Sequence, residues 1–422
     1  MSLQLSDAPN TRSGALGFRP SEQILAAMLD QLIERGALAV AFPSGRVRRF
    51  GQADAAPVSV ALKHAGALKR LMANPELALG ELYVEGLLAV EGDRIDALLA
   101  VVLQNLRDRG FRTRTAPAGL RLIEGPRREV NSRDRAERNV AHHYDISNEF
   151  YRLFLDDDMQ YSCAYFEQAG DTLEAAQAAK KKLIARKLCL RPGLSVLDIG
   201  CGWGGLALHL TQVHDVRVRG ITLSQAQLPV ARMRANAQGL AERAKFALED
   251  YRDTKGKFDR IVSVGMFEHV GGGHYDAFFR QVAALLAEDG VALLHTIGRA
   301  DGPGATSPWI DRYIFPGGYT PALSEIMPAI ERAGLYVTDV EVWRLHYALT
   351  LRAWRERFEA RIDDVREMFD EQFCRMWRFY LAASEAAFRY GGHVVFQVQL
   401  ARRQDAVPRT RSYLAENADS NE

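Results

Sequence analysis

The 422-residue chain has only four cysteines, at positions 163, 189, 201 and 374, too few and too scattered for a disulfide framework or a CxxC zinc site. No apolar run approaches the roughly 20 residues that span a bilayer, and the first residues lack the basic and then apolar pattern of a signal peptide. A strong net charge is also absent, since 54 Lys and Arg face 53 Asp and Glu. These absences predict a soluble cytoplasmic protein with reduced thiols and no nucleic-acid partner.

Length and composition indicate two globular domains, because 47% apolar and 25% charged residues supply enough core for both. The boundary falls in residues 105–138, a stretch punctuated by Pro and Gly that holds ten Arg against five Asp or Glu. Such a run is typical of a solvated linker or of a contact with anionic lipid headgroups. We therefore expect a small N-terminal domain over 1–118, a basic linker over 119–140, a larger domain over 141–404 and a flexible tail over 405–422.

The N-terminal domain has a mixed α+β pattern. Apolar residues recur at helical spacing over 21–35, with Ser21 as the expected N-cap. Residues 37–51 are typical of a hairpin that turns at Pro43, Ser44 and Gly45. We expect further elements around 57–63, 64–73 and 95–106.

Beyond residue 140, helix and strand patterns alternate, which predicts an α/β fold with a parallel sheet and helices on both faces. We expect seven strands, over 195–200, 216–222, 244–249, 258–264, 290–296, 336–343 and 393–402.

The stretch from Ser195 to Gly205 reads as a buried strand that runs into a glycine turn and opens a helix. Its glycines let the backbone turn tightly and approach a ligand, and the helix N-terminus offers unpaired N–H groups. The turn therefore predicts a nucleotide-type cofactor. Gly200, Gly202 and Gly205 also satisfy the G-x-G-x-x-G spacing, so a nicotinamide enzyme is one interpretation.

Two details favour S-adenosylmethionine over a dinucleotide. Asp198 precedes the first glycine, where a carboxylate would repel a pyrophosphate but suits a ligand that carries an ammonium and a sulfonium. The second strand ends at Gly220–Ser224 without the acidic residue that a dinucleotide fold uses for the ribose. We therefore favour a class I methyltransferase, whose Rossmann-like sheet has seven strands, over a dehydrogenase.

Ligands of open α/β sheets lie outside the carboxyl ends of the strands. The polar residues at or just beyond these ends are Asp198, Thr222, Asp250, Glu268 and His295. Asp250 is placed to accept from an adenine amino group, with Tyr251 available to cover the ring. Gln227 has two interpretations, a contact to the cofactor ribose or one half of an S-x-x-Q capping box with Ser224.

A set of ordered motifs extends over residues 140 to about 400. Besides the glycine turn, they are His143–Asp145, Asn148, Met159–Tyr165, Gly220–Ser224, Met266–Gly271, Leu294–Gly298, Tyr313–Gly318, and His346 and Tyr347 with Leu351 and Trp354. The set resembles cyclopropane fatty acid synthases and is far more specific than the turn alone. Residues 1–120, with Leu79–Gly86, resemble the smaller N-terminal domain of the bacterial members.

The resemblance implies that the enzyme adds a methylene from S-adenosylmethionine across a cis double bond of a phospholipid acyl chain. It also implies a bound bicarbonate ion as the base that deprotonates the methylated carbocation. The implied bicarbonate site is the backbone at Cys163, the carboxylate of Glu268, the imidazole of His295, the backbone at Ile297 and the hydroxyl of Tyr347. To Asp198, the resemblance adds the cofactor contacts Tyr161, Ser162, Gly200, Gly202, Thr222, Gln227, Asp250 and Tyr251.

Other reactive side chains have plainer interpretations. We expect a structural or backbone role for Cys163 and a space-filling role for Cys201 in the cofactor turn. His269 is expected to face away from Glu268 and to orient the loop. A metal site is not expected, because the triple glycine between His269 and His274 is too flexible for a rigid pair of ligands.

The resemblance also implies a peripheral association with the inner face of the cell membrane, a lipid-binding N-terminal domain and, as often in bacterial members, a homodimer. Residues 299–320, rich in Gly and Pro, are expected to form a lid or a wall for the acyl chain. Two alternatives stay open. One is a C-methyltransferase that makes methylene- or methyl-branched chains, and the other is a non-catalytic lipid-binding protein.

Overall fold

The computed structural model describes residues 19–108 and 146–415, which form two compact units. The first unit contains the described residues up to 108 together with Ser307–Trp309 and Ile362–Gly391, and the second contains the remainder. We expected Ile362–Gly391 in the larger domain, whereas the chain returns here to the unit of the N-terminal residues. The linker expected over 119–140 and the motif His143–Asp145 lie outside the described residues.

The first unit contains a four-stranded sheet in the order β2-β1-β3-β4. Its strands are β1 (Ala37–Ala41), β2 (Val47–Gly51), β3 (Val58–Leu62) and β4 (Leu88–Val90). The expected hairpin is present, because β1 and β2 pair antiparallel and the N–H of Gly45 donates to the carbonyl of Phe42 in the turn. Strand β3 is parallel to β1, and β4 is antiparallel to β3.

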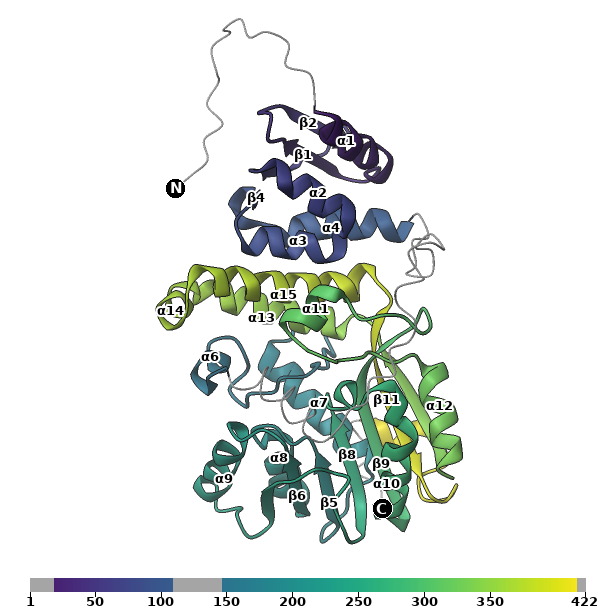
Figure 1. The fold of residues 1–422 in the computed structure, drawn as a ribbon. Coiled ribbons are helices and arrows are strands. Elements are labelled where there is room, and N and C mark those ends of the chain that lie inside the picture. Colours follow the sequence, from purple (N-terminus) through teal and green to yellow (C-terminus); the bar gives the residue numbers. More distant parts are fainter. Residues whose placement is uncertain (1–18, 109–145, 416–422) are drawn as a thin grey trace, which may run out of the picture. The chain divides into compact units, whose positions relative to one another are not determined.

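Helices of the first unit come from both ends of its sequence (Figure 1). They are α1 (Pro20–Leu32), α2 (Ala65–Ala73), α3 (Pro75–Val84), α4 (Ile95–Asp108), α14 (Ile362–Met368) and α15 (Glu371–Tyr390). The last of these packs against α3 and α4. The expected Ser21 cap is wrong, since α1 begins at Pro20 and the Glu22 carboxylate accepts instead from the N–H of Arg19 at 3.1 Å.

The second unit contains a seven-stranded sheet in the order β10-β11-β9-β8-β5-β6-β7. Its strands are β5 (Ser195–Ile199), β6 (Arg217–Thr222), β7 (Ala244–Leu248), β8 (Phe258–Val264), β9 (Leu286–Arg299), β10 (Tyr336–Trp343) and β11 (His393–Ala401). All seven expected strands are confirmed, although β9 starts four residues earlier than predicted. The all-parallel prediction is wrong for β11, which runs antiparallel to both β9 and β10.

Two hydrophobic cores cover the two faces of this sheet, because neighbouring residues of a strand point to opposite sides. Val196 belongs to the core under α7, α8 and α9, whereas Leu197 belongs to the core under α10 and α12 (Figure 1). The helices of the unit are α6 (Asn148–Arg152), α7 (Leu173–Lys187), α8 (Gly205–His214), α9 (Gln227–Ala237), α10 (Tyr275–Leu285), α11 (Pro308–Tyr313), α12 (Leu323–Arg332) and α13 (His346–Ala360). This three-layer arrangement fixes the carboxyl ends of β5, β6 and β8 beside one another.

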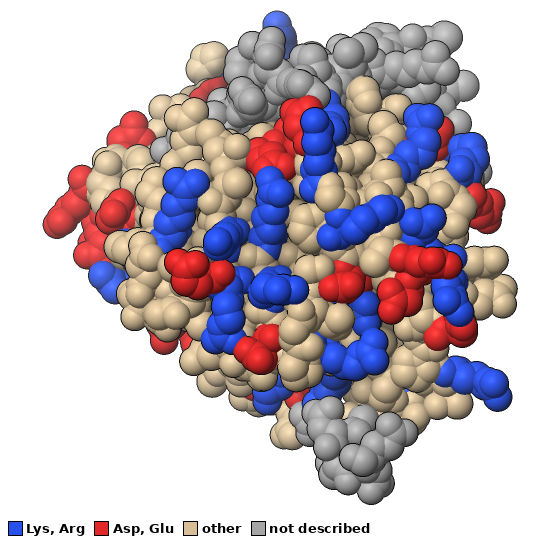
Figure 2. Space-filling view, turned by 90° about the horizontal axis from the view of Figure 1, so that it is seen from below, with Lys and Arg blue, Asp and Glu red and all other residues tan. Residues whose placement is uncertain are grey.

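The surface mixes charges of both signs. On the face drawn in Figure 2, Lys and Arg side chains lie among Asp and Glu side chains instead of forming a patch of one sign. Ion pairs such as Arg332 with Asp276, 2.6 Å apart, are part of this balance. Within 19–108 and 146–415, no helix combines the length and the apolar composition needed to cross a bilayer.

Candidate active site

The glycine turn between β5 and α8 adopts backbone conformations that favour glycine. Gly200 has a φ of +84°, and a Cβ at this position would lie 2.8 Å from the Cβ of Met266. Gly204 has a φ of +83° and is the N-cap residue of α8. Because other residues rarely adopt this φ, glycine here allows the backbone to approach both the loop after β8 and a ligand.

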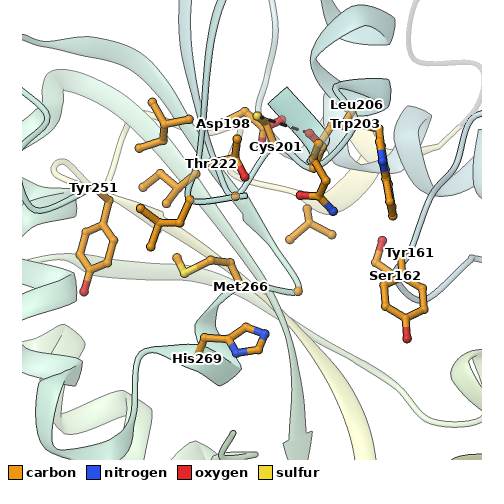
Figure 3. A pocket seen from close by; sticks show the side chains of 18 of the residues that line it. Tyr161, Ser162, Asp198, Cys201, Trp203, Leu206, Thr222, Tyr251, Met266 and His269 are labelled. Carbon is orange, nitrogen blue, oxygen red and sulfur yellow. Dashed lines mark hydrogen bonds between the residues drawn. The ribbon is translucent and has the colours of Figure 1, made fainter. Parts of the chain in front are cut away.

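A cavity lies beside this turn, where β5, β6 and β8 end. Figure 3 shows Tyr161 and Tyr251 at opposite ends of the cavity, with Met266 and His269 together along another side. All nine residues expected to contact the cofactor line this cavity, namely Tyr161, Ser162, Asp198, Gly200, Gly202, Thr222, Gln227, Asp250 and Tyr251.

Asp198 is the most deeply buried of the acidic residues that line this cavity. Its side chain is 2% exposed, and its Oδ2 atom has no hydrogen-bond partner among the described residues. Burial raises the pKa of the carboxyl group to about 7. A buried carboxylate with an oxygen that makes no hydrogen bond suits a cationic ligand. Such a ligand would replace the favourable interactions with water that the carboxylate loses on burial.

The other acidic end of the cavity is already partly neutralised. The carboxylate of Asp250 accepts from Arg252, at 2.9 Å from Nε and 2.5 Å from Nη2. Tyr251 packs its ring edge-on against Phe278, with 5.3 Å between the centroids. Asp250 lines the cavity, and the sequence argument missed that Arg252 holds its carboxylate.

Gln227 is the first residue of α9, whose N-cap is Ala226 instead of the expected Ser224. The backbone N–H of Gln227 donates to the Ser224 hydroxyl at 3.2 Å, as a capping residue requires, and the residue also lines the cavity. The backbone N–H of Ser224 donates in turn to the Thr222 hydroxyl at 3.1 Å. The loop after β6 is thus closed by its own side chains, which leaves Thr222 and Gln227 at the cavity wall.

Several lining residues were missed by the sequence argument, including Met159, Gln160, Trp203, Leu206, Glu249, Met266 and His269. Gln160 and Trp203 stand inside motifs that we had noted, so their position next to predicted contacts was an available signal. His269 does not merely orient the loop, because its ring faces the cavity (Figure 3). Burial lowers the pKa of His269 to about 4, so the imidazole is neutral at pH 7.

Glu268 and Ile297, two of the five residues of the implied bicarbonate site, are joined directly. The backbone N–H of Ile297 donates to Oε1 of Glu268 at 2.6 Å. The Oε2 atom is buried, and the described residues offer it no hydrogen-bond partner. Burial raises the pKa of Glu268 to about 7, although the hydrogen bond from Ile297 opposes the shift. One carboxylate oxygen is therefore held by the backbone of β9, and the other has no partner among the described residues.

His295 lies on β9 two residues before Ile297, so both residues belong to the same face of the strand. It is 2% exposed, and its Nδ1 lies 3.1 Å from Nε2 of Gln397 on β11. Its pKa falls well below the ordinary value because burial and the charges of Lys180 and Lys187 disfavour the imidazolium. The imidazole is therefore neutral.

The segment that follows Cys163 is held by α13, the helix that carries Tyr347. The N–H of Ala164, which follows Cys163, donates to the Thr350 hydroxyl at 3.0 Å, and Thr350 lies one turn after Tyr347. The Tyr347 ring packs edge-on against Trp354, with 5.8 Å between the centroids. Burial raises the pKa of the Cys163 thiol, which keeps the thiol protonated at pH 7.

The five residues of the implied bicarbonate site do not line the cofactor cavity. Their chain neighbours do, since Ser162 precedes Cys163 and His269 follows Glu268. Residues of the cofactor cavity and residues of the implied bicarbonate site therefore alternate in the segments at 161–163 and 266–270. In the described ranges, no group of three His, Cys, Asp or Glu side chains is arranged to hold a metal ion.

Comparison with known proteins agrees with this geometry. The family described as mycolic acid cyclopropane synthetase matches residues 131–398, and a domain of unknown function matches residues 24–109. The cyclopropane-fatty-acyl-phospholipid synthase of Escherichia coli K12 is 40% identical over 351 residues, which cover 82% of this chain and 88% of that protein. Tuberculostearic acid methyltransferase of Mycobacterium tuberculosis is 40% identical over 285 residues, 64% of this chain and 66% of that protein.

A solved structure shows the same fold. The crystal structure of a mycolic acid cyclopropane synthase complexed with SAH and CTAB aligns with a TM-score of 0.60 and 36% identity. The alignment covers 63% of this chain and 97% of that protein. The chain therefore belongs to the cyclopropane-fatty-acyl-phospholipid synthase family of S-adenosylmethionine-dependent methyltransferases.

Proposed function

We propose that the protein transfers a methylene from S-adenosylmethionine to a cis double bond of a phospholipid acyl chain and forms a cyclopropane ring. The observation that carries this proposal is a pair of buried carboxylate oxygens, Oδ2 of Asp198 and Oε2 of Glu268, that have no hydrogen-bond partner among the described residues. We assign the first to a cofactor site and the second to an adjoining anion site. A cationic methyl donor suits the first site, and a proton-accepting group suits the second. The named activity of the Escherichia coli relative supports the same conclusion.

Two groups supply the chemistry when they are bound. S-adenosylmethionine brings an electrophilic methyl group, which leaves the sulfonium as the alkene carbon bonds to it, and bicarbonate brings the base for the proton that is lost before ring closure. For the first group, Asp198 balances the positive charge and the glycine turn offers close backbone contact. For the second, Glu268 offers an oxygen and His295 offers a ring N–H.

Aromatic side chains around these sites keep water away from the reacting groups. Tyr161 packs against Trp354 with 5.1 Å between the centroids. Tyr165 stacks on His346 at 4.7 Å and lies 4.8 Å from Trp343. These rings exclude the water that would trap a carbocation as an alcohol, and their faces also stabilise positive charge.

The substrate determines where the protein acts. Acyl chains of phospholipids lie in membranes, and the described residues include no membrane-spanning helix. We infer a peripheral association with the inner face of the cell membrane, in which the N-terminal unit helps to bind lipid. A homodimer is part of the same proposal.

A methyl-branched or methylene product is the second candidate, because a relative of 40% identity is named tuberculostearic acid methyltransferase. The two reactions share the methyl transfer and differ in which carbon of the cation loses the proton, so this protein alone would give a ring or an unsaturated methyl- or methylene-branched chain. A saturated branch would need a separate hydride donor. Purified protein with S-adenosylmethionine, bicarbonate and vesicles of cis-monounsaturated phospholipid tests both candidates. A mass gain of one methylene unit that Glu268→Ala abolishes would support the proposal.

Fragmentation of the product then separates a ring from a branch. A branched product from the wild-type protein would replace the first candidate by the second. No mass change, despite measurable binding of S-adenosylmethionine, would contradict both. His274→Ala serves as a control for the Glu268 variant, because His274 follows the same loop and does not line the cavity.

A further inference from the structure

Lys180 on α7 is a buried cation next to both sites. Its side chain has no exposed area. Its Nζ donates to Oε1 of Gln160 and to the hydroxyl of Ser162, each at 2.8 Å. Both acceptors line the cofactor cavity, and Ser162 precedes Cys163. Lys180 therefore lies behind the segment that carries contacts of both adjoining sites.

The charge of Lys180 is not balanced by a direct partner. Within the described ranges, no carboxylate lies within ion-pair distance of its Nζ, and both of its hydrogen-bond acceptors are neutral. Burial of an ammonium in this state costs several kcal/mol in desolvation. Asp156 and Asp158 lie beyond ion-pair distance and offset part of the ammonium charge. The part that remains produces a positive potential to which a small anion would be attracted.

The influence of this charge reaches the implied bicarbonate site. The Ser162 hydroxyl that accepts from the Lys180 ammonium at 2.8 Å belongs to the residue directly before Cys163. The Lys180 charge also contributes, with burial, to the lowered pKa of His295. The pKa of Lys180 is lowered to about 8, chiefly by desolvation, while Asp156, Cys163 and Asp158 act to raise it. The side chain is therefore mostly charged at pH 7.

A positive charge is needed near Glu268 if an anion is to bind there. The Glu268 carboxylate stands in the same site as the proposed bicarbonate, and two anions in a buried site repel each other. We propose that Lys180 is a positioning residue whose ammonium holds the Gln160–Ser162 segment and supplies the positive potential that lets an anionic base bind beside Cys163, Glu268 and His295. This inference rests on the proposed use of bicarbonate.

A second residue on α7 allows the two contributions of Lys180, its hydrogen bonds and its positive charge, to be tested separately. Gln177, one turn before Lys180, donates from Nε2 to the carbonyls of Gln160 at 3.2 Å and Ser162 at 3.0 Å. It holds the same segment without any charge. Lys180→Met removes the charge and the hydrogen bonds, whereas Gln177→Met removes hydrogen bonds alone, so the two variants form a matched pair.

The test measures turnover against bicarbonate concentration in carbonate-depleted buffer, and binding of S-adenosylmethionine by calorimetry. Lys180→Met should raise the half-saturating bicarbonate concentration by about 10-fold or more. Gln177→Met should leave that concentration within about two-fold of wild type, although both variants weaken cofactor binding.

Equal bicarbonate requirements in Lys180→Met and wild type would overturn the role of Lys180 alone. Turnover of the wild type without bicarbonate would overturn the proposed base and, with it, this inference. Should Lys180→Met not fold, Lys180→Ala with added propylammonium replaces it, and recovery of bicarbonate affinity with propylammonium but not with propanol supports the inference. Equal recovery with both compounds would overturn it.

Discussion

Nε2 of Gln397 lies 3.1 Å from Nδ1 of His295, and both side chains are buried. An amide nitrogen only donates, so Nδ1 of the neutral imidazole must accept. The proton of His295 then resides on Nε2, which makes that atom a hydrogen-bond donor. Gln397 therefore fixes the tautomer that an anion beside His295 requires.

Replacing Gln397 with Glu should reverse this tautomer. The carboxylate accepts from Nδ1–H, Nε2 loses its proton, and the donor to the bound anion disappears. We expect turnover to fall by about 100-fold or more, as wrong-tautomer variants of catalytic histidines do. Nitrogen-15 NMR of labelled histidine reports the protonated ring nitrogen directly, with His295→Gln used to assign the signal.

Gln399 provides the control, because it lies two residues further along β11 and is 1% exposed. It donates to the carbonyl of Lys187 and bonds to the Tyr413 hydroxyl, and it does not contact His295. Gln399→Glu should lower stability but leave the His295 tautomer unchanged. An unchanged tautomer in Gln397→Glu would contradict the assignment.

Much of the cofactor site follows from the sequence because its residues come directly after strands. Once β5, β6 and β7 are predicted, the rule for open α/β sheets places Asp198, Thr222 and Asp250 at one edge. These three residues line the cavity for this reason, whereas Tyr161 and Ser162, which follow no strand, came only from the family resemblance. The hairpin and the seven strands likewise follow from local apolar patterns.

The remaining features depend on contacts that local patterns do not reveal. Gln397 meets His295 across 102 positions of the sequence, and Lys180 meets Ser162 across 18. The direction of β11 was also not predictable, because a buried strand has the same apolar pattern whether its neighbours run parallel or antiparallel. Ser21 was a plausible cap until Glu22 proved to accept from the Arg19 N–H.

Glu268 should make stability depend on pH. Its folded pKa of about 7 lies above the ordinary value of 4.5, so between these values the folded protein binds a proton that the unfolded chain has lost. The free energy of unfolding therefore falls as the pH rises through this window. Glu268→Gln removes the effect and should be more stable than wild type by about 3 kcal/mol at pH 8, but not at pH 4.5.

Urea unfolding of both proteins at several pH values checks this prediction. The difference between variant and wild type isolates Glu268, since the buried carboxyl of Asp198 contributes equally to both. A constant difference across the pH range would show that Glu268 is ionised in the folded protein throughout. If Glu268→Gln is more stable than wild type but has lost turnover, the Glu268 carboxylate is needed for the reaction although it lowers stability.

Asp198 should couple cofactor binding to pH. A cationic ligand favours the carboxylate, so binding of S-adenosylmethionine lowers the pKa from about 7 and releases a proton at lower pH. Affinity should therefore increase between pH 6 and pH 8. Asp198→Asn should weaken binding by about 10-fold or more and abolish this dependence.

Calorimetry at pH 6.5 in two buffers of different ionisation enthalpy measures the released proton. Thr222→Val is the comparison variant, because Thr222 lines the same cavity without a charge. It should weaken binding while proton release persists. Proton release that persists in Asp198→Asn would assign the titration to another group.

Gly205→Ala should weaken both the cofactor turn and the segment behind it. A Cβ at Gly205 would lie 2.6 Å from Oδ2 of Asp158, which is itself held by Nζ of Lys181 at 2.5 Å and by Nε2 of Gln160 at 3.0 Å. Apart from this clash, alanine stabilises a helix more than glycine does. The clash with Asp158 is therefore the reason that we expect Gly205→Ala to lower the free energy of unfolding. We expect a destabilisation of about 1–3 kcal/mol and weaker binding of S-adenosylmethionine.

Gly272 is the matched control, because a Cβ there would meet nothing within 4 Å and its backbone is not in the left-handed region. Gly272→Ala should change the free energy of unfolding by less than about 0.5 kcal/mol. Thermal unfolding with and without S-adenosylmethionine measures both effects. The increase in unfolding temperature caused by S-adenosylmethionine should be smaller than in wild type for Gly205→Ala and unchanged for Gly272→Ala. A stabilised Gly205→Ala with full cofactor affinity would mean that Asp158 and Gln160 move aside without cost, and that their hydrogen bonds do not hold the cavity wall.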